Sequence, residues 1–184
     1  KTLQAFLMQA AYRTRNGIRN FDGFPLVLNV YTTESDNQPL KLDTVFSGSP
    51  YDDWNIVQFV FKKPVRCKSL KLEFVTVTQD GSFSHFAYHA VSGVLQFIKG
   101  KEYDEITFEK ATGNYNREEF IKKNKIQTAD FTYSSNTGSK NDNQFPFSNA
   151  FDNKSSTYWI SSNEVTESFK PYIEVNFKEP VSLE

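Results

Sequence analysis

The chain has almost no sulfur and almost no net charge. It contains one methionine and one cysteine, Cys67, and 21 basic residues nearly cancel 22 acidic ones, which leaves a formal charge of -1. A lone cysteine excludes an intrachain disulfide and a multi-cysteine metal site, and it leaves the redox compartment open. We expect Cys67 to be a small buried hydrophobic residue. The near-zero charge removes the electrostatic basis for non-specific binding to nucleic acid or anionic membrane.

Long hydrophobic runs are also missing. No run reaches the roughly 18 apolar residues that a membrane-spanning helix needs, so no transmembrane segment is predicted. Residues 1–4 do not have the layout of a signal peptide. The 184 residues suggest one domain with an extension, because a typical domain has about 150 residues.

Aromatic residues are abundant, with 18 Phe, 9 Tyr and 2 Trp. Such rings suit half-buried pleated surfaces. Apolar and polar residues alternate with a two-residue period, as in strands with one face in a core, in residues 26–31, 54–61, 69–74 and 172–177. Glycine-containing breakers lie between several of these segments. The sequence therefore predicts an all-β protein, an antiparallel β-sandwich of the jelly-roll type.

Residues 100–129 are more charged and less periodic than their flanks and are predicted to be a linker. Asn116 and Glu119 have the spacing of a capping box before an apolar pair and a lysine-rich end, which predicts one short helix inside this linker. The polar composition of residues 134–144 predicts a loop.

Residues 148–159, Ser-Asn-Ala-Phe-Asp-Asn-Lys-Ser-Ser-Thr-Tyr-Trp, resemble the opening signature of the factor 5/8 type C (discoidin-like) family. In that family an alanine, an aspartate, a small loop and a threonine precede a tryptophan. A strand and a proline turn follow in residues 172–181, as they do in the family. The resemblance implies a galactose-binding-like β-sandwich similar to the family 32 carbohydrate-binding modules.

The family's next elements match the beginning of this chain, in residues 13–17, 23–30, 54–65 and 70–75. The resemblance therefore implies a circularly permuted order, in which residues 1–99 and 130–184 together form one discoidin-like sandwich. Alternatively, the chain is an excerpt of a tandem array, and residues 130–184 complete the sandwich of a neighbouring molecule through self-association.

The resemblance also implies a function: non-catalytic recognition of a glycan through loops at one end of the sandwich, in an extracellular or cell-surface protein. No nucleophile elbow, phosphate loop or zinc-ligand set is visible in the sequence, so no enzyme is predicted. His85 and His89 have the spacing of helical zinc ligands, but Phe86 stands where a zinc peptidase has its glutamate.

Sugar recognition combines an aromatic face with planar hydrogen-bonding side chains. Side chains of both kinds occur in the predicted loops, and the ligand-binding candidates are Arg13, Arg15, Asn16, Phe24, Tyr51, His85 and His89. For Trp54 and Trp159 we predict burial rather than sugar stacking. The competing hypothesis is a structural, protein-binding or membrane-surface adhesion module, because the same fold presents loops to proteins or lipids.

In the resembled family the loop at residues 150–157 often holds calcium, a hard cation that takes about six to eight oxygens. Carried over, the ligands are the carboxylate of Asp152, the backbone oxygens of Ala150 and Lys154, and hydroxyl or carbonyl oxygens of Ser156 or Thr157. The family's late strand often adds a glutamate, but this chain has Val-Ser-Gly-Val at residues 91–94. The alternative is an Asx-type turn that satisfies itself.

Overall fold

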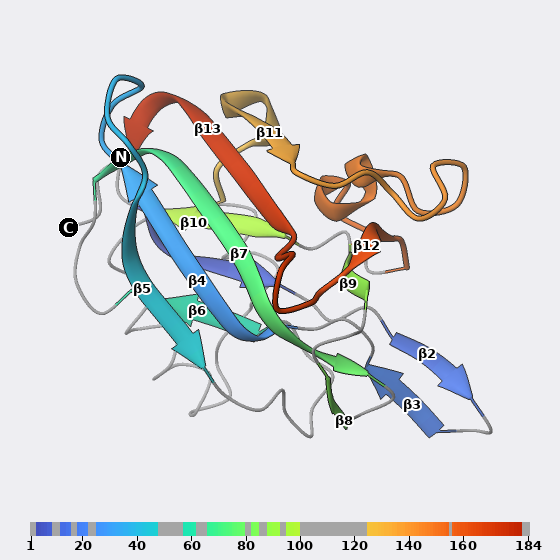
Figure 1. Cartoon of the computed structure of the whole chain (residues 1–184). Helices are drawn as coiled ribbons and strands as arrows, with labels where there is room; N and C mark the ends of the chain where they lie inside the picture. The colour runs from blue at the N-terminus through green and yellow to red at the C-terminus, as the bar shows by residue number, and fades with distance from the viewer. Residues whose placement is uncertain are drawn as a thin grey trace, which may run out of the picture.

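The computed structural model describes residues 3–8, 12–15, 18–21, 25–47, 57–61, 66–79, 82–84, 88–92, 95–99, 125–154 and 156–181. Strands dominate these residues (Figure 1). They are β1 (Leu3–Met8), β2 (Tyr12–Arg15), β3 (Ile18–Phe21), β4 (Pro25–Thr33), β5 (Lys41–Ser47), β6 (Val57–Val60), β7 (Cys67–Gln79), β8 (Ser82–Ser84), β9 (Tyr88–Ser92), β10 (Gln96–Lys99), β11 (Phe131–Ser135), β12 (Tyr158–Glu164) and β13 (Tyr172–Val181). Two short 3-10 helices, η1 (Thr128–Asp130) and η2 (Phe147–Phe151), complete the described elements. The predicted all-β character is confirmed.

The largest sheet is antiparallel and has six strands, in the order β11-β13-β7-β4-β5 with β8 added to β7. β13 lies between β7 and β11, as Figure 1 shows. The permuted order predicts that residues 172–177 lie between two strands from residues 1–99, and on one side residues 172–176 do pair with residues 69–73 of β7. On the other side the neighbour is β11, which comes from the C-terminal part.

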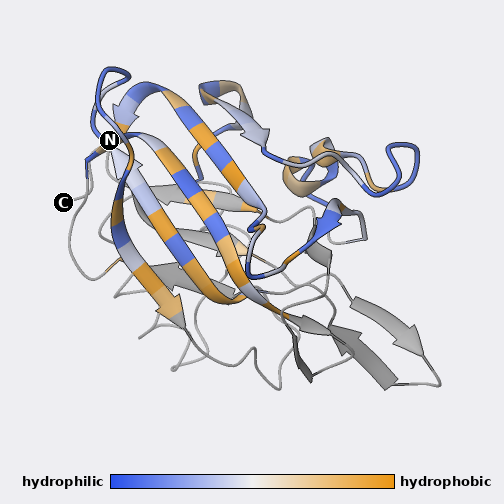
Figure 2. Ribbon diagram, viewed as in Figure 1, coloured by the Kyte–Doolittle hydropathy of each residue, from blue (hydrophilic) through white to orange (hydrophobic). Residues whose placement is uncertain are grey.

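The two-residue periodicity places one face of this sheet in the core. Leu70, Leu72 and Phe74 of β7 are completely buried, and the intervening residues are partly exposed. β13 shows the same alternation, with Ile173 and Val175 buried. Figure 2 shows the alternating hydrophobic and hydrophilic bands along β4, β7 and β13. The strand predictions for these segments are therefore confirmed.

A second sheet has three strands in the order β10-β1-β6 and lies behind the large sheet in the view of Figure 1. Phe97 of β10 is completely buried, and its ring centroid lies 5.6 Å from that of Phe177 and 5.5 Å from that of Phe131, both in edge-to-face geometry. Met8, at the end of β1, belongs to the same core. Smaller two-stranded sheets pair β12 with β9 and β2 with β3.

The structure differs from the sequence-based expectation at the ends of two elements. β13 continues through Pro180 to Val181 instead of turning, with a register shift after Asn176. Proline has no N–H to donate, and irregular positions of a strand tolerate it. In the predicted loop 134–144, the first two residues belong to β11.

The end of the predicted linker packs onto the core. Ile126 is buried, and its backbone N–H donates to the carbonyl of Phe97 at 2.7 Å. The predicted helix around Asn116 lies outside the described residues. Among the described residues no helix is long and apolar enough to cross a membrane.

Cys67 is completely buried, as predicted. Burial, and to a smaller extent the negative charge of Asp43, raises the pKa of its thiol from 9.0 to about 12. Because the folded pKa lies above the ordinary one, the protonated thiol contributes stability that is fully present below pH 9 and is lost as the pH rises towards 12.

We expect iodoacetamide to alkylate Cys67 at least roughly tenfold more slowly in the native protein than in urea, because the reactive thiolate is disfavoured and covered. Mass spectrometry of timed samples at pH 8 measures both rates. Equal rates in the two conditions would contradict the burial of this thiol.

Candidate functional site

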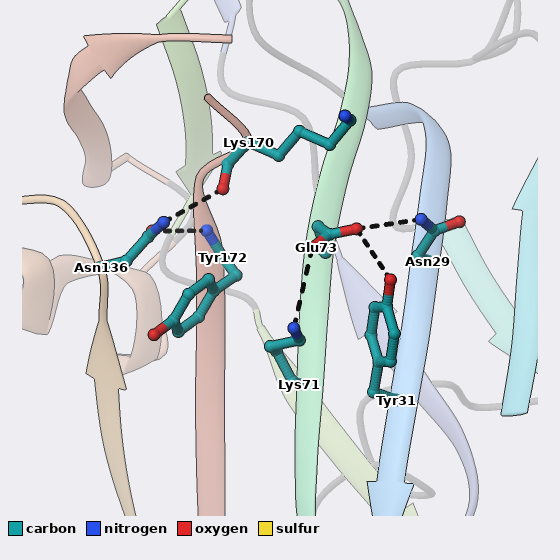
Figure 3. Close-up of polar contacts among 7 residues, drawn as sticks. All are labelled: Asn29, Tyr31, Lys71, Glu73, Asn136, Lys170 and Tyr172. Carbon is teal, nitrogen blue, oxygen red and sulfur yellow. Dashed lines mark hydrogen bonds and ion pairs between the residues drawn. The ribbon is translucent and has the colours of Figure 1, made fainter. Parts of the chain in front are cut away.

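The solvent-facing side of the six-stranded sheet carries a cluster of polar and aromatic side chains (Figure 3). The register places Tyr31 of β4 beside Lys71 of β7, and Asn29 of β4 beside Glu73 of β7. On the other side of β7, Tyr172 of β13 is paired with Glu73. Since directly paired residues point to the same face of a sheet, three neighbouring strands bring these side chains together.

Glu73 is the centre of the hydrogen-bond network. Its Oε1 accepts a hydrogen bond from Asn29 Nδ2 at 3.0 Å and one from the Tyr31 hydroxyl at 3.1 Å. Its Oε2 lies 3.7 Å from Lys71 Nζ. Burial, then the hydrogen bond and the negative charge of Glu73, raises the pKa of Tyr31 above its ordinary value. The Tyr31 hydroxyl therefore stays protonated and donates to Glu73 at neutral pH.

Lys71 lies between two aromatic rings. Its Nζ is 4.0 Å from the centroid of the Tyr31 ring and 5.2 Å from that of Tyr172. Both distances are within the range of a cation–π interaction. The side chains of Lys71 and Glu73 are 19% and 17% exposed, so the cluster is fixed in place but reachable from solvent.

Two polar groups of this face, the Tyr172 hydroxyl and the Glu174 carboxylate, have no hydrogen-bond partner among the described residues. We call these two groups open. The backbone at Tyr172 is nevertheless held, because its N–H donates to Asn136 Oδ1 at 2.8 Å while Asn136 Nδ2 donates to the carbonyl of Lys170 at 3.1 Å (Figure 3). The cluster therefore offers an open donor and an open acceptor on a fixed frame.

The loop expected to hold calcium forms a compact turn after η2. The Asp152 carboxylate accepts a hydrogen bond from the Lys154 N–H at 2.9 Å, and the Thr157 hydroxyl lies 2.8 Å from each of its oxygens. Asn153 between them has a left-handed φ of 68°, which asparagine tolerates better than most residues. This is the geometry of the Asx-type turn.

The other oxygens expected to bind the metal also have hydrogen-bond donors. The carbonyl of Ala150 accepts from the Leu95 N–H at 3.1 Å, and the carbonyl of Lys154 accepts from the Thr157 N–H at 3.3 Å. Ser156 is exposed. In the described part of the chain no group of three or more His, Cys, Asp or Glu side chains is placed to hold a metal ion. These contacts fit a self-satisfied turn better than a cation cage, and calcium binding here stays a prediction.

We expect Asp152→Ala to lower the free energy of unfolding by about 1–2 kcal/mol, because two local hydrogen-bond donors lose their acceptor. Urea denaturation measures the change, and Asp142→Ala, in the neighbouring exposed loop, is the matched control. Thermal melts of the wild type in calcium and in EDTA test the metal separately, since a ligand bound to the native state raises the melting temperature. Superimposable melts would contradict calcium binding. An unchanged free energy of unfolding for Asp152→Ala would contradict the structural role of the turn.

Three of the seven predicted ligand-binding residues lie in described strands, and the prediction that the seven form one site stays a prediction. Arg13 and Arg15, expected on a loop, lie in β2, where they pair with Asn20 and Ile18 of β3. His89 lies in β9. The remaining candidates lie outside the described residues: Asn16, Phe24, Tyr51 and His85.

Trp159 is completely buried, so the prediction of burial is confirmed for it, and Trp54 lies outside the described residues. The sequence analysis missed two aromatic features. One is the pair of tyrosines around Lys71, and the other is the stacked pair of Phe145 and Tyr158, whose centroids lie 5.0 Å apart. The polar and aromatic residues at the outward-facing positions of β4, β7 and β13 could have indicated the first feature, but the pairing register of these strands cannot be derived from their sequences.

Comparison with known protein families, with curated proteins and with solved structures finds no match to this chain. A functional assignment therefore depends on the chemistry of the residues themselves.

Proposed function

We propose that this chain is a non-catalytic module that binds a neutral glycan, and that the solvent-facing cluster of the six-stranded sheet makes the contact. As part of the same proposal, the six- and three-stranded sheets are the two layers of a discoidin-like β-sandwich in an extracellular or cell-surface protein. The all-β character and the resemblance of residues 148–159 to the factor 5/8 type C signature support this proposal.

The observation that carries the proposal is the arrangement of Tyr31, Lys71 and Tyr172 with Glu73. A sugar presents apolar C–H faces and hydroxyl edges, so a site for it needs an aromatic surface next to hydrogen-bonding groups. Tyr172 offers both a ring and an open hydroxyl, and Glu174 offers an open carboxylate to accept from sugar hydroxyls. The hydrogen bonds to Glu73 fix Asn29 and Tyr31 beside these groups before binding, which reduces the entropy cost of association.

A neutral ligand fits the charges of this face better than an anionic one. Lys71 is its central cation, and it is already close to the carboxylate of Glu73. Glu174 is paired with Lys71 across the β7–β13 ladder and adds a second negative charge. Among the described residues, this cluster therefore has no surplus of positive charge to hold a sulfated or carboxylated sugar.

The test is a glycan array followed by calorimetry on the best neutral glycan. Tyr172→Ala should weaken binding at least about tenfold, or roughly 1.4 kcal/mol, because it removes both the ring and the hydroxyl. Tyr158→Ala is the matched control, since it removes a partly buried tyrosine that follows the loop at residues 150–157. A loss with Tyr158→Ala alone would move the site to the loops, and the absence of any glycan hit would overturn the proposal.

The competing class, a membrane-surface or protein-adhesion module, is tested in parallel by sedimentation with liposomes that contain anionic lipid. The proposal expects no cosedimentation, because the chain has a formal charge of only -1. Cosedimentation without a glycan hit would favour the membrane-adhesion function instead.

A further inference from the structure

The solvent-facing cluster belongs to two rows of paired residues that cross four strands, from β13 to β5. In the first row Glu174 is paired with Lys71, Lys71 with Tyr31, and Tyr31 with Leu42. In the second row the pairing runs from Tyr172 through Glu73 and Asn29 to Val45. Since paired residues share a face, each row is a continuous line of side chains across the strands.

The two rows change character from one end to the other. At the β13 end they carry the open Tyr172 hydroxyl and Glu174 carboxylate. At the β5 end they finish in Leu42 and Val45, which are 53% and 51% exposed. These two are the exposed large hydrophobic side chains among the residues whose burial the structure describes. An apolar end and a polar end are therefore joined by the fixed network around Glu73.

The length of the rows limits the size of the ligand. Three steps between neighbouring strands, each of about 4.8 Å, give roughly 14 Å, which is close to the length of three linked pyranose units. One sugar ring, about 5 Å long, would contact only two neighbouring strands at this spacing. A site that bound only the terminal sugar of a glycan would therefore leave either the apolar or the polar end of the two rows without a contact.

We infer that this face binds an extended, uncharged oligosaccharide of about three units, laid across the strands from β13 to β5, rather than a single terminal sugar. This inference rests on the proposed glycan-binding function and adds the class of ligand to it. Leu42 and Val45 cover the C–H face of the last unit, and Tyr172 and Glu174 bind the hydroxyls of the first.

The experiment is calorimetric titration of the whole chain with β-1,4-linked glucose and galactose oligomers of one to six units. For the series that binds, affinity should rise about tenfold or more from one to three units and then level off. A monosaccharide that binds as tightly as the trimer would overturn the extended-chain inference and leave glycan binding intact. The absence of binding by every oligomer would overturn both.

A double variant, Leu42→Thr with Val45→Thr, tests the apolar end directly. Both side chains are about half exposed and threonine suits a strand, so the variant is expected to fold. It should lose the gain in affinity from the third unit and leave disaccharide affinity unchanged within about twofold. An unchanged length dependence, or a dimer in sedimentation that this variant abolishes, would overturn the inference, since a second copy would then cover the face.

Discussion

Replacing Trp159 with alanine is expected to lower the free energy of unfolding by about 3–5 kcal/mol, the usual cost of a large buried aromatic side chain. Trp159 is completely buried, and its ring lies 4.8 Å from that of Phe147, between centroids. The residue is also the paired partner of Val91 in the β12–β9 ladder. The substitution therefore leaves a cavity between η2 and this small sheet.

Urea denaturation followed by far-ultraviolet circular dichroism measures this change. Trp159→Phe keeps part of the ring and should cost clearly less than Trp159→Ala. If Trp159→Ala costs less than about 1 kcal/mol, a value typical of exposed positions, the packing described for this residue is wrong.

Placing a carboxylate in the middle of β13, as in Val175→Asp, should prevent folding altogether. Val175 is completely buried and is paired with Leu70 on one side and Tyr133 on the other. A buried carboxylate without a partner costs several kcal/mol, which approaches the whole stability of an ordinary domain, about 5–15 kcal/mol.

Proton NMR spectra should show loss of chemical-shift dispersion for Val175→Asp. Glu174→Ala is the matched control, because Glu174 is the neighbouring, partly exposed position on the opposite face. A dispersed spectrum for Val175→Asp with native stability would contradict the position of β13 inside the sheet.

The strands that sequence analysis predicts correctly are those with one buried face. Residues 26–30, 70–74 and 173–177 alternate in the sequence because every second side chain lies in the core, so the period alone reveals them. β11 is missed because its sequence, Phe-Thr-Tyr-Ser-Ser, is short and polar and resembles a loop. Cys67 and Trp159 are predicted correctly because residues of these types are usually buried.

The solvent-facing cluster could not be predicted in the same way. Tyr31, Lys71 and Tyr172 are far apart in the chain, and a shift of one residue in any ladder would move one of them to the opposite face. The register also contains irregularities, between Val30 and Tyr31 in the β4–β5 ladder and after Asn176 in the β7–β13 ladder. Periodicity within a strand carries no information about such shifts between strands.

The position of β13 also has a consequence for how fast the protein folds. The side chains of Ser69 and Asn176 are hydrogen-bonded across the β7–β13 ladder, although 107 positions separate them in the chain. Bringing two strands together over such a separation costs chain entropy before their contacts can stabilise the pairing. Proteins rich in distant strand pairings therefore fold in about milliseconds to seconds. Until β13 docks, the edge of β7 is unpaired and open to strands of other molecules. Refolding should therefore be slow and sensitive to protein concentration, with aggregation competing most strongly before the last strand is in place.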